Sequence, residues 1–155
     1  MGDLNYSFEH LDSLMEDAGL DALLITSKHN VQYLLGGHKF IFFSAMDAIG
    51  HGRYLPILIY MRGEKDKTAY VANAMEKGEY ENDPFWVPHF YPMAWGSVDS
   101  INQAIAHLNK VGFTTGRIGV EPSFLPSDSH GVLTDALPNS ALMDATAVME
   151  NLRAV

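Results

Sequence analysis

Seven histidines are the first residues in this sequence whose chemistry could support catalysis or metal binding. They are His10, His29, His38, His51, His89, His107 and His130. A zinc site needs three or four ligands that converge on one point. No two of these histidines have H-x-x-x-H spacing, and the HExxH pattern is absent. We therefore predict surface or half-buried histidines and no metal ligand in this chain.

The other common catalytic patterns are also missing. There is no cysteine, which excludes a thiol nucleophile and a disulfide, and G-x-S-x-G, the P-loop and a G-x-G-x-x-G after a strand do not occur. Ser97 follows a glycine but precedes an apolar stripe, so it is predicted to cap a helix. The carboxylate pairs Asp128 with Asp135 and Glu79 with Glu81 are interpreted as solvated surface charge. The sequence thus predicts no catalytic residue.

The segment 37–53 remains a candidate for function because it is apolar where a polar loop would be usual. Two interpretations stay open: a strand whose side chains enter the core, or a surface that faces a substrate or a partner. Arg53 could pair with a carboxylate through two hydrogen bonds. The candidate substrate-facing or partner-facing residues are His38, Phe40, Phe42, Phe43, His51 and Arg53.

The composition limits the class of protein and of partner. Of 155 residues, 47% are hydrophobic and 19% are charged, so the chain should fold around one core. A formal net charge of −9 argues against a nucleic acid or an anionic membrane as the main partner. The polar start lacks a secretory signal, and no apolar run reaches the roughly 18 residues of a membrane span. We expect a cytoplasmic protein.

The elements that must position these residues alternate between helical and strand patterns. An apolar stripe predicts a helix over 8–18, with Ser7 as its cap and Gly19 as its stop. A buried strand is expected at 21–27, followed by a short helix capped by Ser27. Further expected elements are strands at 54–61 and 68–75 forming a hairpin, a short strand near 87–92, a helix over 98–108, a strand at 117–121, a helix before Pro138, a brief strand near 141–145 and a last helix from 146. The stretch 76–86 is expected to be polar and rich in turns. This order predicts a single α/β domain with a mixed sheet.

Three stretches of the sequence resemble the creatinase/prolidase N-terminal domain. "AGLDALLITSKHNVQYLLGG" matches its opening pattern at Asp21, Ala22, Thr26, Ser27, Asn30, Tyr33, Leu34 and Gly36. "RIGVEPSFLP" and "ALPNSALMDATAVMENLRAV" are similar to its later blocks. Asn30 and Tyr33 are interpreted as packing and capping groups rather than catalysts.

The resemblance implies a three-layer α/β/α domain with a mixed, ribonuclease H-like sheet that spans residues 1–155. It also implies a catalytic pita-bread domain, C-terminal to and absent from this chain, where two Asp, one His and two Glu hold two divalent metal ions (Mn, Zn or Co). The chain would then be the inactive N-terminal domain of an Xaa-Pro dipeptidase-like metallopeptidase. Its expected partners are its own catalytic domain, a second subunit in a homodimer and a proline-containing peptide substrate. A free-standing ligand-binding or protein-binding module is the alternative.

Overall fold

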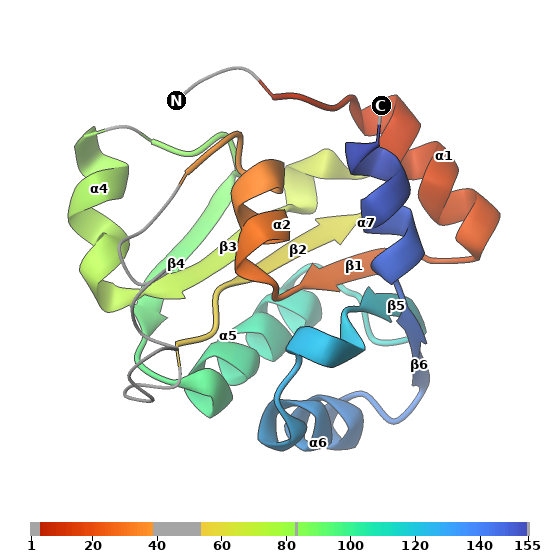
Figure 1. The fold of residues 1–155 in the computed structure, drawn as a ribbon. Coiled ribbons are helices and arrows are strands. Elements are labelled where there is room, and N and C mark those ends of the chain that lie inside the picture. Colours follow the sequence, from red (N-terminus) through yellow and green to blue (C-terminus); the bar gives the residue numbers. More distant parts are fainter. Residues whose placement is uncertain (1–3, 39–53, 83, 155) are drawn as a thin grey trace.

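The computed structural model describes residues 4–38, 54–82 and 84–154, which form three layers with a sheet in the middle (Figure 1). The strands are β1 (Ala22–Ile25), β2 (Ile57–Met61), β3 (Ala69–Asn73), β4 (His89–Ala94), β5 (Gly116–Val120) and β6 (Ser140–Asp144). The helices are α1 (Phe8–Ala18), α2 (Lys28–Leu34), α4 (Lys77–Asn82), α5 (Ser97–Lys110), α6 (Ser127–Ala136) and α7 (Thr146–Arg153). Short 3₁₀ turns are η1 (Lys65–Lys67), η2 (Ala74–Glu76) and η3 (Pro122–Phe124).

The six strands form one mixed sheet in the order β4-β3-β2-β1-β5-β6. Strand β2 is antiparallel to its neighbours β1 and β3, and the other pairs are parallel. Strands β1, β2 and β3 are buried along their whole length, as expected for strands covered on both faces. The predicted fold class, a three-layer α/β/α domain with a mixed sheet, is confirmed, and Pro56 directly precedes the central strand β2.

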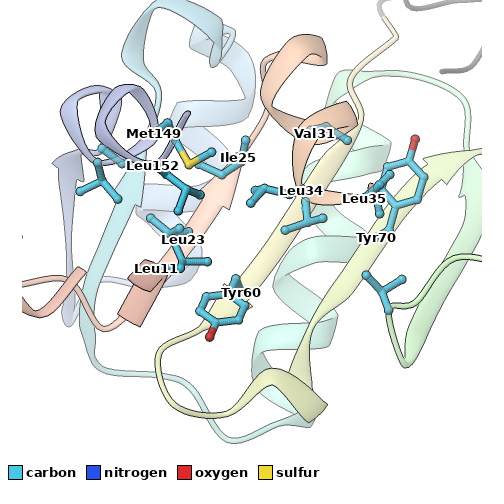
Figure 2. Packing of buried hydrophobic residues seen from close by; sticks show 14 of the residues in the cluster. Leu11, Leu23, Ile25, Val31, Leu34, Leu35, Tyr60, Tyr70, Met149 and Leu152 are labelled. Carbon is cyan, nitrogen blue, oxygen red and sulfur yellow. The ribbon is translucent and has the colours of Figure 1, made fainter. Parts of the chain in front are cut away.

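Successive side chains of a strand point to opposite faces of the sheet, so the strands contribute to two separate hydrophobic cores. On one face, Leu23 and Ile25 pack with apolar side chains of α1, α2 and α7 (Figure 2). On the other face, Ala22 and Leu24 pack against α5 and α6. Burying one such leucine contributes roughly 2 kcal/mol, so both faces hold the sheet in place. The two edge strands β4 and β6 are more exposed.

The first helix forms as the sequence predicts. Leu11 and Met15, one turn apart, are fully buried. The Ser7 side chain accepts a hydrogen bond from the backbone N–H of His10, and Gly19 ends the helix in the left-handed conformation with φ 73°. Both ends of α1 are therefore specified by local residues.

Three local predictions differ from the structure in whole or in part. Ser97 is the first residue of α5 rather than its cap, and its hydroxyl donates to Asp128 Oδ2 at 3.1 Å. Ser27 stands at the N-cap position of α2 without a capping bond from its side chain, because that hydroxyl is used elsewhere. The stretch 76–86, expected to be rich in turns, contains the helix α4. Within the described ranges, no helix combines the length and apolar character needed to cross a membrane.

Candidate functional site at the carboxyl edge of the sheet

Most of the buried polar side chains lie at one end of the strands, which we call the carboxyl edge of the sheet. Strands β1, β3 and β5 run in the same direction, so their carboxyl ends meet at this edge, and the antiparallel β2 begins there. The edge therefore receives Thr26 after β1, Glu76 after β3, Glu121 after β5 and Tyr54 before β2. In open α/β sheets, ligands bind outside the carboxyl ends of the strands. This edge is the candidate functional site.

Glu121 is a buried carboxylate that joins the end of β5 to the end of β1. It is 3% exposed, and its Oε1 accepts the backbone N–H groups of Thr26 at 3.0 Å and Ser27 at 2.8 Å. Its Oε2 accepts the Ser27 hydroxyl at 2.7 Å and the Asn30 amide at 2.6 Å. Four donors thus compensate the desolvation of the carboxylate. The Ser27 hydroxyl serves this bond instead of capping α2.

Asn30 extends this network to the last helix. Its Oδ1 accepts a hydrogen bond from Arg153 Nη1 at 3.1 Å. The Arg153 guanidinium also lies over the Tyr33 ring, 5.7 Å from its centroid. The three sequence stretches that carry the family resemblance therefore meet at Glu121 and Asn30. Asn30 thus makes hydrogen bonds within the domain and Tyr33 packs against Arg153, while their interpretation as groups without a catalytic role stays a prediction.

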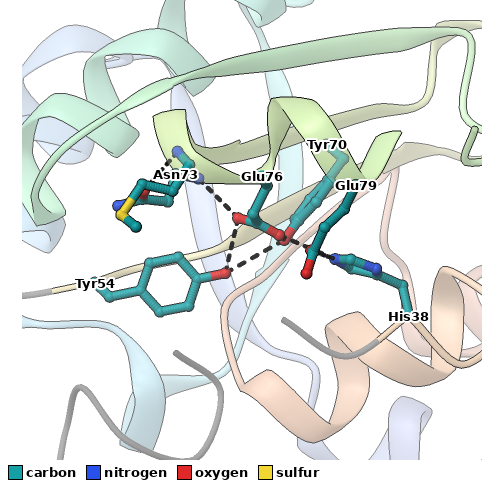
Figure 3. Close-up of polar contacts among 7 residues, drawn as sticks. His38, Tyr54, Tyr70, Asn73, Glu76 and Glu79 are labelled. Carbon is teal, nitrogen blue, oxygen red and sulfur yellow. Dashed lines mark hydrogen bonds and ion pairs between the residues drawn. The ribbon is translucent and has the colours of Figure 1, made fainter. Parts of the chain in front are cut away.

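Glu76 is a second buried carboxylate, at the other side of β2 (Figure 3). It is fully buried, and its Oε2 accepts the backbone N–H of Asn73 at 2.8 Å and the Tyr54 hydroxyl at 3.0 Å. Its Oε1 accepts the Tyr70 hydroxyl at 2.7 Å and lies 3.0 Å from His38 Nε2. Three of these four contacts come from side chains that can titrate.

The two phenols at Glu76 are strongly perturbed. Burial raises the pKa of Tyr54 well above its usual range, and the negative charge of Glu76 raises it further. Burial also raises the pKa of Tyr70, which the Tyr54 and Glu76 charges reinforce. Both phenols therefore stay protonated and act as hydrogen-bond donors to the carboxylate.

His38 and Glu79 form the more exposed side of this cluster. The His38 side chain is 11% exposed, whereas that of Glu79 is 46% exposed and lies 3.8 Å from His38 Nε2. Desolvation raises the pKa of Glu79 and the Glu76 charge adds to this, while His38 acts in the opposite direction. The His38 ring also packs edge-on against Phe85, with centroids 4.4 Å apart.

The residues of this edge do not fit a pair of catalytic metal ions. Among the described residues, one group of side chains could hold an ion, namely His38, Glu76 and Glu79. Their ligand atoms lie within 4.8 Å of one another. The group contains no Asp and only one accessible carboxylate. Both oxygens of Glu76 already accept hydrogen bonds from protein donors. A centre of two Asp, one His and two Glu cannot be built from this set.

Most of the candidate residues named from the sequence fall outside the part of the chain that the structure describes. Phe40, Phe42, Phe43, His51 and Arg53 belong to 39–53, which is not described. The sixth candidate, His38, packs into the carboxyl edge against Glu76. The partner-facing role of these residues stays a prediction.

The acidic pairs considered from the sequence are mainly surface groups. Glu79, Glu81, Asp128 and Asp135 are all exposed. Asp128 accepts hydrogen bonds from Ser97 and from the backbone N–H of Ser129. The residue that matters in this region is Glu76, which the sequence analysis missed. The spacing of Asn73 and Glu76 is a capping-box pattern that could have revealed η2, and both of its hydrogen bonds are present.

One histidine contradicts the expectation of surface or half-buried positions. His107 on α5 is 1% exposed. Its Nε2 donates to the carbonyl oxygen of Lys67 at 2.7 Å, and its Nδ1 accepts the Tyr91 hydroxyl at 2.8 Å. Burial lowers the pKa of His107, so the neutral ring joins α5 to the sheet as a structural group.

Comparisons with known proteins agree with this architecture. The sequence model of the Creatinase/Prolidase N-terminal domain matches residues 8–155. Creatinase from Bacillus sp. (strain B-0618) is 29% identical over 140 residues, which are 90% of this chain and 31% of creatinase.

Solved structures share the fold. A dipeptidase from Pyrococcus horikoshii OT3 superposes with a TM-score of 0.65 at 20% identity, over 94% of this chain and 36% of its own. A proline dipeptidase from Streptococcus pneumoniae superposes with a TM-score of 0.69 at 14% identity, over 97% of this chain and 98% of its own. The chain thus spans about a third of creatinase and of the Pyrococcus enzyme, and nearly the whole of the Streptococcus structure.

Proposed function

The chain belongs to the creatinase/prolidase N-terminal domain family, and we propose that it serves as the non-catalytic N-terminal domain of an Xaa-Pro dipeptidase-like metallopeptidase. In this role it contributes to dimerisation and shapes the substrate pocket of a catalytic domain. The two divalent metal ions, Mn, Zn or Co, would be held by that catalytic domain. The observation that carries the proposal is a family match over 8–155 in a chain that spans 31% of creatinase and 36% of a solved dipeptidase.

The geometry of Glu76 supports the pocket-shaping part of this role. His38 and Tyr54 are the described residues on either side of 39–53, and the side chains of both contact Glu76. One buried carboxylate therefore fixes the points where the chain enters and leaves the segment predicted to face a substrate or a partner. Glu76 would thus hold His38 and Tyr54 in place without touching substrate itself.

The first test asks whether this domain has peptidase activity on its own. The 155-residue chain is incubated with an Xaa-Pro dipeptide and Mn²⁺, and release of proline is measured. We expect no turnover, because the described residues do not supply a dinuclear centre. Turnover that disappears when a residue of this chain is substituted would contradict the non-catalytic role.

The second test examines positioning in the protein that joins this domain to its catalytic domain. We expect His38→Ala to raise KM for an Xaa-Pro dipeptide several-fold with a smaller change in kcat. His130→Ala, at an exposed position on α6, is the matched control and should leave both unchanged. Sedimentation measures the dimer in parallel. Equal kinetics for the two variants would overturn the pocket-shaping role, and a monomer at assay concentration would overturn the dimerisation role.

A further inference from the structure

A cavity of about 330 Å³ lies at the carboxyl ends of β5 and β6. After β5 the chain turns to α6, which packs on one face of the sheet, and after β6 it turns to α7, which packs on the other face (Figure 1). Open α/β sheets bind ligands outside the carboxyl ends of their strands where the connections diverge in this way. The volume lies at the lower end of the range of small-molecule sites, roughly 300–1,000 Å³. Neither the Glu76 cluster nor the proposed role in assembly accounts for this cavity.

The cavity combines an apolar floor with a carboxylate at its rim. Val120 and Leu125 are buried and Leu142 is half-buried, and all three line the cavity. Asp144 is the register partner of Val120 on the neighbouring strand, and it is exposed. A negative charge that solvent and ligands can reach therefore lies beside an apolar surface.

Backbone hydrogen bonds hold these walls in place before any ligand arrives. The Ala145 N–H donates to the carbonyl oxygen of Val120 at 2.8 Å, which joins the end of β6 to the end of β5. The Phe124 N–H donates to the carbonyl oxygen of Glu121 at 2.9 Å and closes η3, between β5 and α6. A preformed site loses little conformational entropy when a ligand binds.

The charges at the cavity favour a cation. Among the described residues that line it, the ionisable ones are Asp144 and His130, and there is no Lys or Arg. Hydrogen bonds from the side chain and the backbone N–H of Thr146 lower the pKa of Asp144, so its carboxylate is ionised at neutral pH. The buried carboxylate of Glu121, next to Val120 in the chain, acts in the same direction. So does the formal net charge of −9.

The two helices that begin beside the cavity do not make it an anion site. Free N–H groups at a helix N-terminus attract anions, but carboxylates already accept from such groups here. In α6 the Ser129 N–H donates to Asp128 Oδ1 at 2.6 Å, and in α7 the Thr146 N–H donates to Asp144 Oδ1 at 2.8 Å. A carboxylate has about four acceptor positions. Asp144 can therefore bind an ammonium group while it keeps its bond to Thr146.

From this geometry we propose that the cavity at the carboxyl ends of β5 and β6 binds a small organic monocation with a compact apolar body. Its ammonium group pairs with Asp144, and its apolar body packs against Val120, Leu125 and Leu142. The site does not depend on the proposed dipeptidase role, because every group that forms it belongs to this chain. It would serve the domain as a separate binding site for an amine.

The test uses 2-phenylethylamine as the probe and its neutral counterpart, 2-phenylethanol, as the matched ligand. Both are titrated into the isotopically labelled chain at pH 7.5, at which an ordinary imidazole is largely uncharged, and backbone amide shifts are recorded by NMR. We expect the amine to shift Val120, Leu142 and Asp144 in a saturable manner. The alcohol should bind about five-fold more weakly, because it loses an ion pair that is only modest at an exposed carboxylate.

Two variants make the result decisive. Asp144→Asn removes the charge but keeps an oxygen that can accept the Thr146 N–H, so it should weaken binding of the amine to the level of the alcohol. Asp135→Asn makes the same change of net charge at an exposed position near the other end of α6, and it should leave binding unchanged.

A thermal melt confirms that each variant is folded, and the comparison of amine with alcohol in the parent chain decides the proposal without a variant. The proposal is overturned if the amine does not bind, if amine and alcohol bind equally, or if Asp144→Asn binds the amine as well as Asp135→Asn does. Shifts that centre on Tyr54 and Leu55, which line another cavity at the start of β2, would also overturn it.

Discussion

Glu76 and Glu121 are two buried carboxylates at the same edge of one sheet, and they are stabilised in different ways. Glu121 accepts two backbone N–H groups, a serine hydroxyl and an amide, none of which titrates near neutral pH. Glu76 accepts one backbone N–H and two phenols, and it contacts a histidine. The first is a cross-link between main-chain segments, and the second is a cluster of ionisable side chains.

Because of this difference, we assign a structural role to Glu121 and a positioning role to Glu76. The donors to Glu121 lie 91 to 95 residues away in the sequence, so this carboxylate closes the contact between β1 and β5 on which the whole sheet depends. Glu76 instead ties down His38, Tyr54 and the start of α4, which lie at the periphery of the sheet. Loss of Glu121 should therefore weaken the global fold, whereas loss of Glu76 should loosen one region.

The largest effect is expected for Glu121→Ala. The change leaves two buried N–H groups, the Ser27 hydroxyl and the Asn30 amide without an acceptor, so the free energy of unfolding should fall by about 4 kcal/mol. Urea denaturation measures this loss. Glu150→Ala, at an exposed position of α7, is the control and should change stability by less than about 0.5 kcal/mol. A loss no larger than the control would mean that Glu121 does not hold the two strands together.

A smaller and more local effect is expected for Glu76→Gln. The amide keeps one acceptor oxygen but turns an NH₂ group towards neighbours that are themselves donors, which should cost about 2 kcal/mol. Hydrogen exchange should accelerate mainly over 73–82, because Glu76 accepts the Asn73 N–H and directly precedes α4. Glu79→Gln, at the exposed side of the cluster, is the matched control. Uniformly faster exchange across the sheet would mean that Glu76, like Glu121, stabilises the whole fold.

Alkaline pH should act on the Glu76 site and not on the Glu121 site. The pKa values of Tyr54 and Tyr70 are raised in the folded chain, so above the usual tyrosine pKa of about 10 the unfolded chain loses protons that the folded chain keeps. The stabilisation is complete below pH 10 and declines as the pH rises. Each phenol should contribute a fall approaching about 1.4 kcal/mol per pH unit.

Urea denaturation of Tyr54→Phe and Tyr70→Phe from pH 9 to 11.5 measures this contribution. Each variant should show a shallower decline than the parent chain, whatever its stability at pH 7. Glu121→Gln should keep the parent slope, since no phenol contacts that carboxylate among the described residues. Parallel slopes for all the variants would show that the phenols do not stay protonated in the fold.

The smallest effect is expected for Arg153→Gln. The side chain is exposed, and its bond to Asn30 lies at the outer end of the Glu121 network, so stability should fall by only about 0.5 kcal/mol. Thermal denaturation at low and high salt measures it. A loss of stability comparable to that of Glu121→Ala would mean that Arg153, on the surface of α7, is as important to the network as Glu121.

The secondary structure near the N-terminus could be read from the sequence because local residues specify it. The spacing of Leu11 and Met15, the cap Ser7 and the stop Gly19 each act within a few residues of α1. The apolar run "DALLIT" predicts a strand covered on both faces, which β1 is. The stretch 76–86 is expected to be rich in turns because its charged residues outweigh a single capping-box pattern, but the structure forms α4 there.

The candidate site was less predictable. The residues that stood out in the sequence were the histidines and the apolar segment 37–53, and of the six substrate-facing or partner-facing candidates in that segment the described structure contains only His38. The sequence did not single out Glu76, Tyr54 or Tyr70, because nothing local to a glutamate indicates that it will be buried. The stretches around Ser27, Asn30 and Glu121 were recognised by resemblance, and their mutual contact emerged only in the fold.

The sequence by itself therefore determined the elements and the family of this protein, because caps, apolar periods and motif letters act over short distances along the chain. Only the tertiary structure decided which carboxylates are buried, which donors satisfy them and where a cavity forms. Those outcomes depend on the direction of β1, β3 and β5 in the sheet, which brings residues separated by up to 95 positions to one edge. The different partners that the two buried glutamates meet at that edge then give the same side chain two different roles.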